Sequence, residues 1–239
     1  MITDREFVRS YSSFWNDTIP FCEAFVRSLN VSFLEQFSRQ QVAQRTIAGR
    51  RALVNELAFS LFEHSSLEQA PVMSFFANRK ALDKICRKTH RRISELEFAN
   101  DAFPPPDLVE QVEALDIAKR LENYFAGIPY VDRIFRPHFA GCGVLDACEG
   151  DVFCLDTLYE IKSGDRNFRG PDLRQLLVYA ALSMEARRYD VARVGLVNPR
   201  HGTHFVMNLD EFCKRLSGSP ASDVLGRIIA FVSGGSASN

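Results

Sequence analysis

Long apolar runs are missing from this 239-residue chain, although 46% of its residues are hydrophobic. No stretch approaches the ~20 apolar residues that a helix needs to cross a bilayer. The sequence also lacks a positively charged start that leads into an apolar segment with a cleavage signal. We therefore expect a cytoplasmic protein without membrane contact, with enough apolar material for the core of one or two domains.

The six cysteines include no Cys-x-x-Cys pair, so the sequence indicates neither a zinc site nor a disulfide framework. Cys142, Cys148 and Cys154 do recur every six residues, and sets of four cysteines can hold an iron-sulfur cluster. Ordinary buried thiols account for this spacing equally well. We expect no iron-sulfur cluster.

A strong excess of positive charge is also absent, because the net charge is -1. This argues against a protein that coats polyanions. Positive charge is nevertheless concentrated between residues 79 and 92, where Arg87, Lys88 and Arg91 lie. On a helix we expect these charges to spread round the surface, which fits a solvated helix or a face that contacts phosphates.

The apolar pattern changes near the run Phe103-Pro104-Pro105-Pro106. Before it, apolar residues recur at spacings of three and four, which predicts helices within 7–29, 42–62 and 72–98. After it, Asp107 can cap a helix that runs to about Phe125. We then expect strands near 131–139, 143–147 and 158–162, a helix over 172–188, strands at 193–197 and 204–208, and a final helix at 221–232.

This order predicts an α/β protein in three parts. Residues 1–103 form an all-helical N-terminal region, and residues 104–233 form a mixed central sheet flanked by helices. The last residues, 234–239, are rich in Ser and are predicted to be disordered.

Two carboxylates and a lysine are predicted to converge at one end of the sheet. Glu160 and Lys162 point to the same face of their strand because strand side chains alternate. If the strand 143–147 pairs with it as a hairpin, Asp146 comes to lie beside them. A solvated cross-strand ion pair is the common alternative, but a carboxylate in the apolar run around Asp146 is costly unless something binds it.

This combination suits metal-dependent phosphate chemistry. Carboxylates are ligands that Mg²⁺ selects, with Mn²⁺ as its substitute, and two of them leave positions open for water and a phosphate oxygen. A metal so bound polarises the phosphate and makes hydroxide available near neutrality. Lys162 would stabilise charge that develops on the phosphate, or help to orient and deprotonate the water, and the sequence leaves both roles open.

Further polar side chains follow directly after Lys162. Gln175 and Tyr179 are four residues apart on the predicted helix, so both can reach one site. Three arginines lie in the preceding loop and at the start of that helix, where guanidinium groups suit bidentate phosphate contacts. These expected nucleic-acid contacts are Arg166, Arg169 and Arg174.

The spacing of Gly143 to Asp146, Glu160-Ile161-Lys162 and Gln175-x-x-x-Tyr179 resembles the PD-(D/E)xK nuclease superfamily, and within it the RecB-like branch. The resemblance covers about residues 108–208. It implies a restriction-endonuclease-like core, in which the metal-binding Asp follows a Gly on the second strand. DNA is the implied partner.

The resemblance also implies further metal ligands. One is the backbone carbonyl of Ile161, and another is a glutamate from the first helix of the core. Glu113 is one candidate for the latter, beside Glu110 and Glu122. The histidine that some RecB-like relatives carry on this helix has no match within 108–125, which argues against close kinship with the processive exonucleases.

The predicted function is a metal-dependent nuclease that hydrolyses DNA phosphodiester bonds. Resemblance alone places small nucleases of this kind in restriction, repair or antiviral defence systems. No Gly-rich Walker-type loop is present, so any ATP-driven unwinding requires a helicase or ATPase partner. Two alternative functions stay open: a non-catalytic nucleic-acid-binding or assembly subunit built on a nuclease scaffold, and a nuclease that cuts RNA. Whether a second copy of the chain is a partner also stays open.

Overall fold

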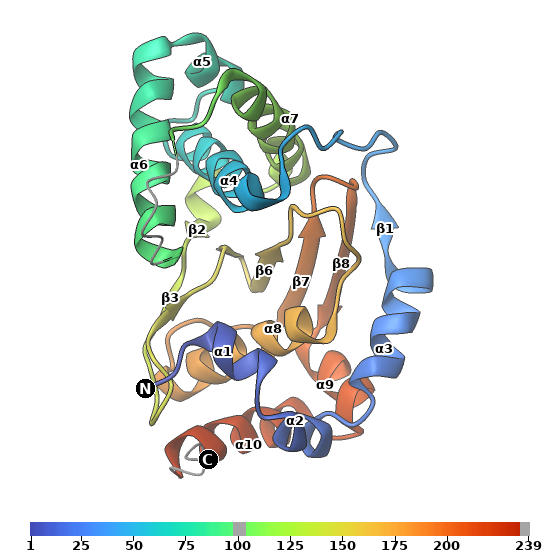
Figure 1. Ribbon diagram of the computed structural model, residues 1–239. Coiled ribbons are helices and arrows are strands. Elements are labelled where there is room, and N and C mark those ends of the chain that lie inside the picture. The colour runs from blue at the N-terminus through green and yellow to red at the C-terminus, as the bar shows by residue number, and fades with distance from the viewer. Residues whose placement is uncertain (98–103, 235–239) are drawn as a thin grey trace.

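A six-stranded mixed sheet separates the helices of this protein into two layers (Figure 1). The computed structural model describes residues 1–97 and 104–234, with side chains described except at 95–97. Only β6 and β7 run parallel among the sheet's neighbouring strands, and α8 connects them. The strand order is β1 (Glu35–Gln36), β8 (Thr203–Asn208), β7 (Arg193–Asn198), β6 (Thr157–Ile161), β5 (Val152–Cys154) and β2 (Arg133–Phe135).

One layer consists of α4 (Arg51–Leu67), α5 (Val72–Ala77), α6 (Arg79–Glu97) and α7 (Leu108–Phe125). Its apolar side chains pack against one face of the sheet, which presents Val152, Cys154, Tyr159 and Val197. None of the helices within the described residues is long and apolar enough to span a membrane.

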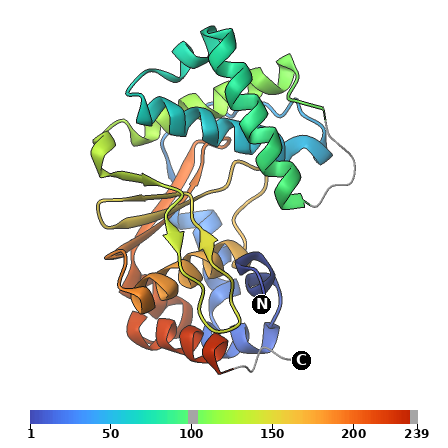
Figure 2. The ribbon, with the colours of Figure 1, turned by 90° about the vertical axis from the view of Figure 1, so that its left-hand side faces the viewer.

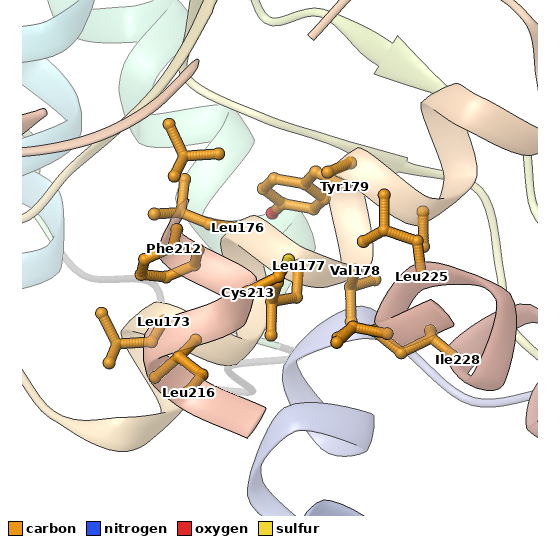
Figure 3. Close-up of a cluster of buried hydrophobic side chains, with 14 of the residues drawn as sticks. Leu173, Leu176, Leu177, Val178, Tyr179, Phe212, Cys213, Leu216, Leu225 and Ile228 are labelled. Atoms are coloured by element: carbon orange, nitrogen blue, oxygen red, sulfur yellow. The ribbon is translucent and has the colours of Figure 1, made fainter. Parts of the chain in front are cut away.

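The other layer surrounds α8 (Gly170–Ala186) and covers the opposite face of the sheet, which presents Phe153, Leu158 and Val194. Figure 3 shows apolar side chains of α8 packed against those of α9 and α10. This layer contains α1 (Asp4–Arg9), α2 (Ser12–Thr18), α3 (Cys22–Ser28), α9 (Leu209–Ser217) and α10 (Ala221–Ser233). Burial of α8 on several sides makes it a rigid support for polar groups that it aims at the sheet.

A small two-stranded ribbon, β3 (His138–Phe139) with β4 (Cys148–Glu149), extends from the main sheet toward the α10 layer (Figure 2). The loop between its strands is fastened there, because the Val144 N–H donates to the Val232 carbonyl at 3.0 Å. Three single turns complete the described structure: η1 (Leu29–Phe33), η2 (Ala48–Arg50) and η3 (Tyr130–Asp132).

The α/β class and the mixed sheet are confirmed, and several elements lie where the sequence predicted them. Helix α7 begins after Asp107, whose side chain accepts the Glu110 N–H at 2.9 Å while the Glu110 carboxylate accepts the Asp107 N–H at 3.0 Å. This reciprocal capping box fixes the start of the helix. The strands predicted at 193–197 and 204–208 correspond to β7 and β8.

The prediction of an all-helical region over 1–103 was wrong in one respect, because β1 pairs with β8 at the edge of the sheet. Its helices also divide between the two layers: α1–α3 pack with α8, and α4–α6 pack with α7. Residues 98–103, where the predicted boundary falls, lie outside the described residues. So does the predicted tail, apart from Gly234.

The strand predicted at 143–147 was also wrong. Gly143 adopts a φ of 56°, a left-handed conformation that turns the chain, and Cys142 and Leu145 exchange backbone hydrogen bonds across this turn. A Cβ on Gly143 would lie 2.1 Å from the Val232 carbonyl oxygen, so close packing requires glycine there. The strand that pairs with β6 is instead β5, which contains residues 152–154.

Candidate active site

Two carboxylates meet where β5 begins and β6 ends. Val152 pairs with Tyr159 in the antiparallel ladder, so Asp151 and Glu160 occupy the next opposing positions. Asp151 Oδ2 accepts a 2.6 Å hydrogen bond from the Ile161 N–H. Glu160 is 5% exposed, and both side chains belong to the face of the sheet that α8 covers, because side chains alternate along strands.

The electrostatics of this carboxylate pair favour a bound cation. Burial and the neighbouring Asp151 raise the pKa of Glu160 to about 8, and burial raises the pKa of Asp151 as well. Glu160 Oε1 accepts a hydrogen bond from Lys162 at 2.7 Å, whereas its buried Oε2 has no hydrogen-bond partner among the described residues. A buried acceptor without a partner is costly, so Oε2 is suited to a metal ion, a proton or a water.

Lys162 connects the carboxylate pair to α8. Its Nζ donates to Glu160 Oε1 and to Gln175 Oε1, both at 2.7 Å. Although burial lowers the pKa of Lys162, the carboxylates of Glu160 and Asp172 outweigh that effect and the pKa is raised. Lys162 therefore carries an ammonium group that two hydrogen bonds fix in place. A fixed, protonated lysine favours the role of stabilising negative charge over the alternative role as a base.

The Gln175 amide is itself held by two further groups. Its Nε2 donates to the Tyr179 hydroxyl at 2.6 Å and to Asp4 Oδ2 at 3.1 Å, and the Tyr179 hydroxyl donates to Asp4 Oδ2 at 2.8 Å. These bonds turn the Gln175 carbonyl toward Lys162. Gln175 and Tyr179 thus lie together at the site, whereas Asp4 was missed because it is 171 residues away in sequence from Gln175.

Asp146 does not pair with Glu160 as the predicted hairpin required. Its N–H donates to the Ile2 carbonyl at 2.9 Å, in the loop beyond the Gly143 turn. It lines a cavity that also reaches Glu160, but the ladder position opposite Glu160 belongs to Asp151. Gly150-Asp151 directly before the apolar run 152–154 is the sequence signal that could have identified this residue.

The three glutamates on α7 are bound elsewhere. Glu113 is fully buried and accepts hydrogen bonds from the backbone N–H groups of Arg45 and Thr46 and, at 2.6 Å, from Arg200. Glu110 belongs to the capping box, and Glu122 accepts from Ser65 and the Val72 N–H. The structure therefore does not bring Glu113, the predicted ligand, to the carboxylate pair.

Glu56 on α4 is the acid that faces the pair from the other layer. It lines two cavities together with Asp151 and Glu160. Burial raises the pKa of Glu56, and the nearby Asp151 adds to this, against the lowering effect of Arg136 and Arg92. Arg136 donates to Glu56 Oε1 at 2.7 Å. No local motif marks Glu56, so the sequence could not identify it.

Within 1–97 and 104–234, no three His, Cys, Asp or Glu side chains are grouped closely enough to hold a metal ion by themselves. The carboxylate donors of the pair are Asp151 and Glu160, and Ile161, the last residue of β6, follows Glu160 directly. A cation bound to two carboxylates would complete its coordination with water or substrate oxygens, as Mg²⁺ commonly does.

The three arginines predicted to bind nucleic acid have different environments. Arg166 makes a bidentate pair with Asp172, with bonds of 2.7 and 2.8 Å. Arg174 donates to the Val8 carbonyl and lies over the Trp15 ring, which are packing contacts. Arg169 is exposed and forms no ion pair with a described residue.

The expected dispersal of positive charge round α6 holds only in part. Arg79 and Arg92 do lie away from the other cations and pair with Asp83, and with Glu56 and Glu149, respectively, but the other cations form a basic stripe. At about 100° per residue, five exposed cations of this helix fall within an arc of about 100°. None of them forms an ion pair with a residue whose side chain is described. They are Lys80, Lys84, Arg87, Lys88 and Arg91.

No protein-family model matches this sequence, and no curated protein shows significant similarity to it. Function is therefore inferred from the geometry of the site and from the motif spacing.

Proposed function

We propose that this protein is a Mg²⁺-dependent nuclease that hydrolyses DNA phosphodiester bonds on a restriction-endonuclease-like core of the PD-(D/E)xK type. The observation that carries the proposal is the buried Glu160 Oε2 beside Asp151, which accepts no hydrogen bond from any described residue, with Lys162 bound to the other Glu160 oxygen. The order β2, β5, β6, α8 and parallel β7 is consistent with such a core. The resemblance assigned the metal-binding Asp to Asp146, and we assign this role to Asp151 instead because it takes the ladder position opposite Glu160.

The donor set fits a hard divalent cation. Asp151 and Glu160 would hold Mg²⁺ or Mn²⁺, with the Ile161 carbonyl as a third protein donor. Once bound, such an ion supplies Lewis acidity at a phosphate oxygen and a water of lowered pKa.

The protein's own groups would orient and stabilise the reacting phosphate. Lys162, held between Glu160 and Gln175, places a fixed positive charge where negative charge develops on the phosphate. Asp4 and Tyr179 keep the Gln175 amide in one orientation, so the ammonium does not have to reorganise during the reaction.

Mg²⁺ is expected to raise the melting temperature more at about pH 8 than at about pH 5. The pKa of Glu160 is raised to about 8 in the folded protein. At Glu160 the folded state thus binds more protons than the unfolded state between roughly pH 4.5 and 8, so the contribution of Glu160 to metal-free stability falls as pH rises through that window. Thermal melts with Mg²⁺ or EDTA would measure this. Glu160→Gln should remove the pH-dependent part of the Mg²⁺ effect, and an unchanged effect in that variant would contradict the assignment.

The function is tested by incubating the purified protein with linear, circular and single-stranded DNA, and with RNA, plus Mg²⁺ or Mn²⁺. Cleavage by the native chain should fall about 100- to 1000-fold in Lys162→Ala, since a fixed transition-state charge is lost, and should be lost in Glu160→Gln. Equal cutting by all three proteins would indicate a contaminant. Retention of DNA without cutting would favour a non-catalytic binding subunit, and cutting of RNA alone would favour the RNA-directed alternative.

A further inference from the structure

A basic cavity opens beside the carboxylate pair, between α1 and the start of α8. Its volume is about 340 Å³. Glu160 and Lys162 line it, so it is continuous with the proposed active site. Its wall contains five cationic side chains and two carboxylates, which gives an excess of three positive charges. The cations are Arg5, Arg9, Lys162, Arg166 and Arg169.

Three of these cations form no ion pair with a residue that the structure describes. Lys162 is bound to Glu160, and Arg166 is paired with Asp172. Arg5, Arg9 and Arg169 are exposed and form no ion pair with a described residue. An anion that enters this cavity therefore meets three guanidinium groups whose donors no described carboxylate occupies, and such groups suit bidentate phosphate contacts.

Helix α1 is held firmly without using its two arginines. Phe7 and Val8 are buried in the core around α8, and Asp4 accepts hydrogen bonds from Gln175 and Tyr179. The Ile2 N–H also donates to a carbonyl of the 140–147 loop at 2.8 Å. The side chains of Arg5 and Arg9 are thus carried by a fixed element and not by a loose terminus.

We propose that this cavity binds the sugar-phosphate backbone of a DNA strand next to the phosphate that is cut, through Arg5, Arg9 and Arg169. The choice of a DNA strand as ligand rests on the proposed function. The cavity volume lies near the lower end of the roughly 300–1,000 Å³ typical of ligand sites, which suits a short stretch of one strand. The positive wall favours a polyanion, and the shared Lys162 directs it to the carboxylate pair.

The test compares two triple variants with the same loss of charge. One is Arg5→Ala/Arg9→Ala/Arg169→Ala, and its matched control on α6 is Arg87→Ala/Lys88→Ala/Arg91→Ala. Binding of a fluorescent single-stranded oligonucleotide is followed by anisotropy in EDTA at several salt concentrations. Urea unfolding midpoints equal to that of the native chain show that both variants fold.

The cavity variant should bind the oligonucleotide at least about tenfold more weakly than the native chain at low salt. A plot of the logarithm of its association constant against the logarithm of the salt concentration should be less steep by about 2, since each contact with a single-strand phosphate contributes about 0.7 to this slope. The α6 variant removes the same charge from a face that does not line the cavity, so it should weaken binding less than the cavity variant does and retain the larger salt slope. Native-like binding by the cavity variant, or an equal loss in the α6 variant, would overturn the proposal.

Binding in EDTA requires neither metal nor cleavage, so its outcome is separate from that of the proposed function. A selective loss in the cavity variant, with no Mg²⁺-dependent cleavage by the native chain, would keep the strand-binding cavity and remove the nuclease. Cleavage by the native chain without a selective loss would keep the nuclease and remove the cavity's assigned role.

Discussion

Asp151→Asn is expected to lower the rate of Mg²⁺-dependent DNA cleavage by about 1000-fold, whereas Asp146→Asn should lower it less than about tenfold. The large effect is expected because a bound metal ion stabilises transition-state charge by several kcal/mol, and each loss of about 1.36 kcal/mol lowers the rate tenfold. Asp151 occupies the ladder position opposite Glu160, and Asp146 lies beyond the Gly143 turn. Initial rates on one linear DNA substrate, at saturating Mg²⁺, give the comparison.

The Asp151→Asn variant retains the shape of the side chain and an oxygen that can accept the Ile161 N–H. Its melting temperature should therefore not fall, which separates lost chemistry from lost folding. The variant also removes the neighbouring charge that raises the pKa of Glu160. If Asp146→Asn is inactive and Asp151→Asn is active, the carboxylate pair described above is not the metal site.

Local patterns explain why part of the site could be predicted from sequence. Glu160 and Lys162 share a face because strand side chains alternate, and Gln175 and Tyr179 share a helical face because they are four residues apart. Each pair needs only one correctly assigned element. The contacts from Lys162 to both Glu160 and Gln175 join the two pairs.

Other parts depend on tertiary contacts that no local pattern records. Asp4 and Arg5 reach the site because Phe7 anchors α1 against α8. Glu56 reaches it from the opposite layer. The run from Gly143 to Ala147 has the apolar character of a strand, but contact with the end of α10 favours a turn. Tertiary packing thus overrides the local β preference there.

The basic stripe on α6 is a different case, because it could have been predicted. The spacing of Lys80, Lys84, Arg87, Lys88 and Arg91 places them on one helical face by arithmetic alone. What the sequence could not show is that this face points away from α4, whose contacts with α6 involve buried side chains on the other side.

Glu113→Ala is expected to destabilise the protein by about 3–5 kcal/mol, the usual cost of breaking a buried ion pair. Glu113 is 0% exposed and Arg200 is 3% exposed, so the substitution leaves a guanidinium group buried without its carboxylate. It also removes the acceptor for the N–H groups of Arg45 and Thr46. Urea unfolding monitored by circular dichroism would measure the change in the free energy of unfolding.

The pH dependence gives an independent check on the same ion pair. Although burial raises the pKa of Glu113, hydrogen bonds from Arg45, Arg200 and Thr46 outweigh it and the pKa is lowered. The folded state thus binds fewer protons than the unfolded state in acid. The stability that Glu113 contributes is present above roughly pH 4.5 and is lost as pH falls through the lowered folded-state pKa. The native chain should therefore lose more stability than Glu113→Ala between about pH 5 and about pH 3.

The double variant Glu113→Leu/Arg200→Met should be less destabilised than the sum of its single variants, because neither charge is then left buried alone.

Cleavage measured well below the melting temperature distinguishes a structural carboxylate from a metal ligand. We expect Glu113→Ala to retain Mg²⁺-dependent cleavage per folded molecule, since Arg200 and the 45–46 backbone occupy its oxygens. Loss of cleavage in a fully folded sample would instead return Glu113 to the metal site, and would require α7 to approach the end of β6.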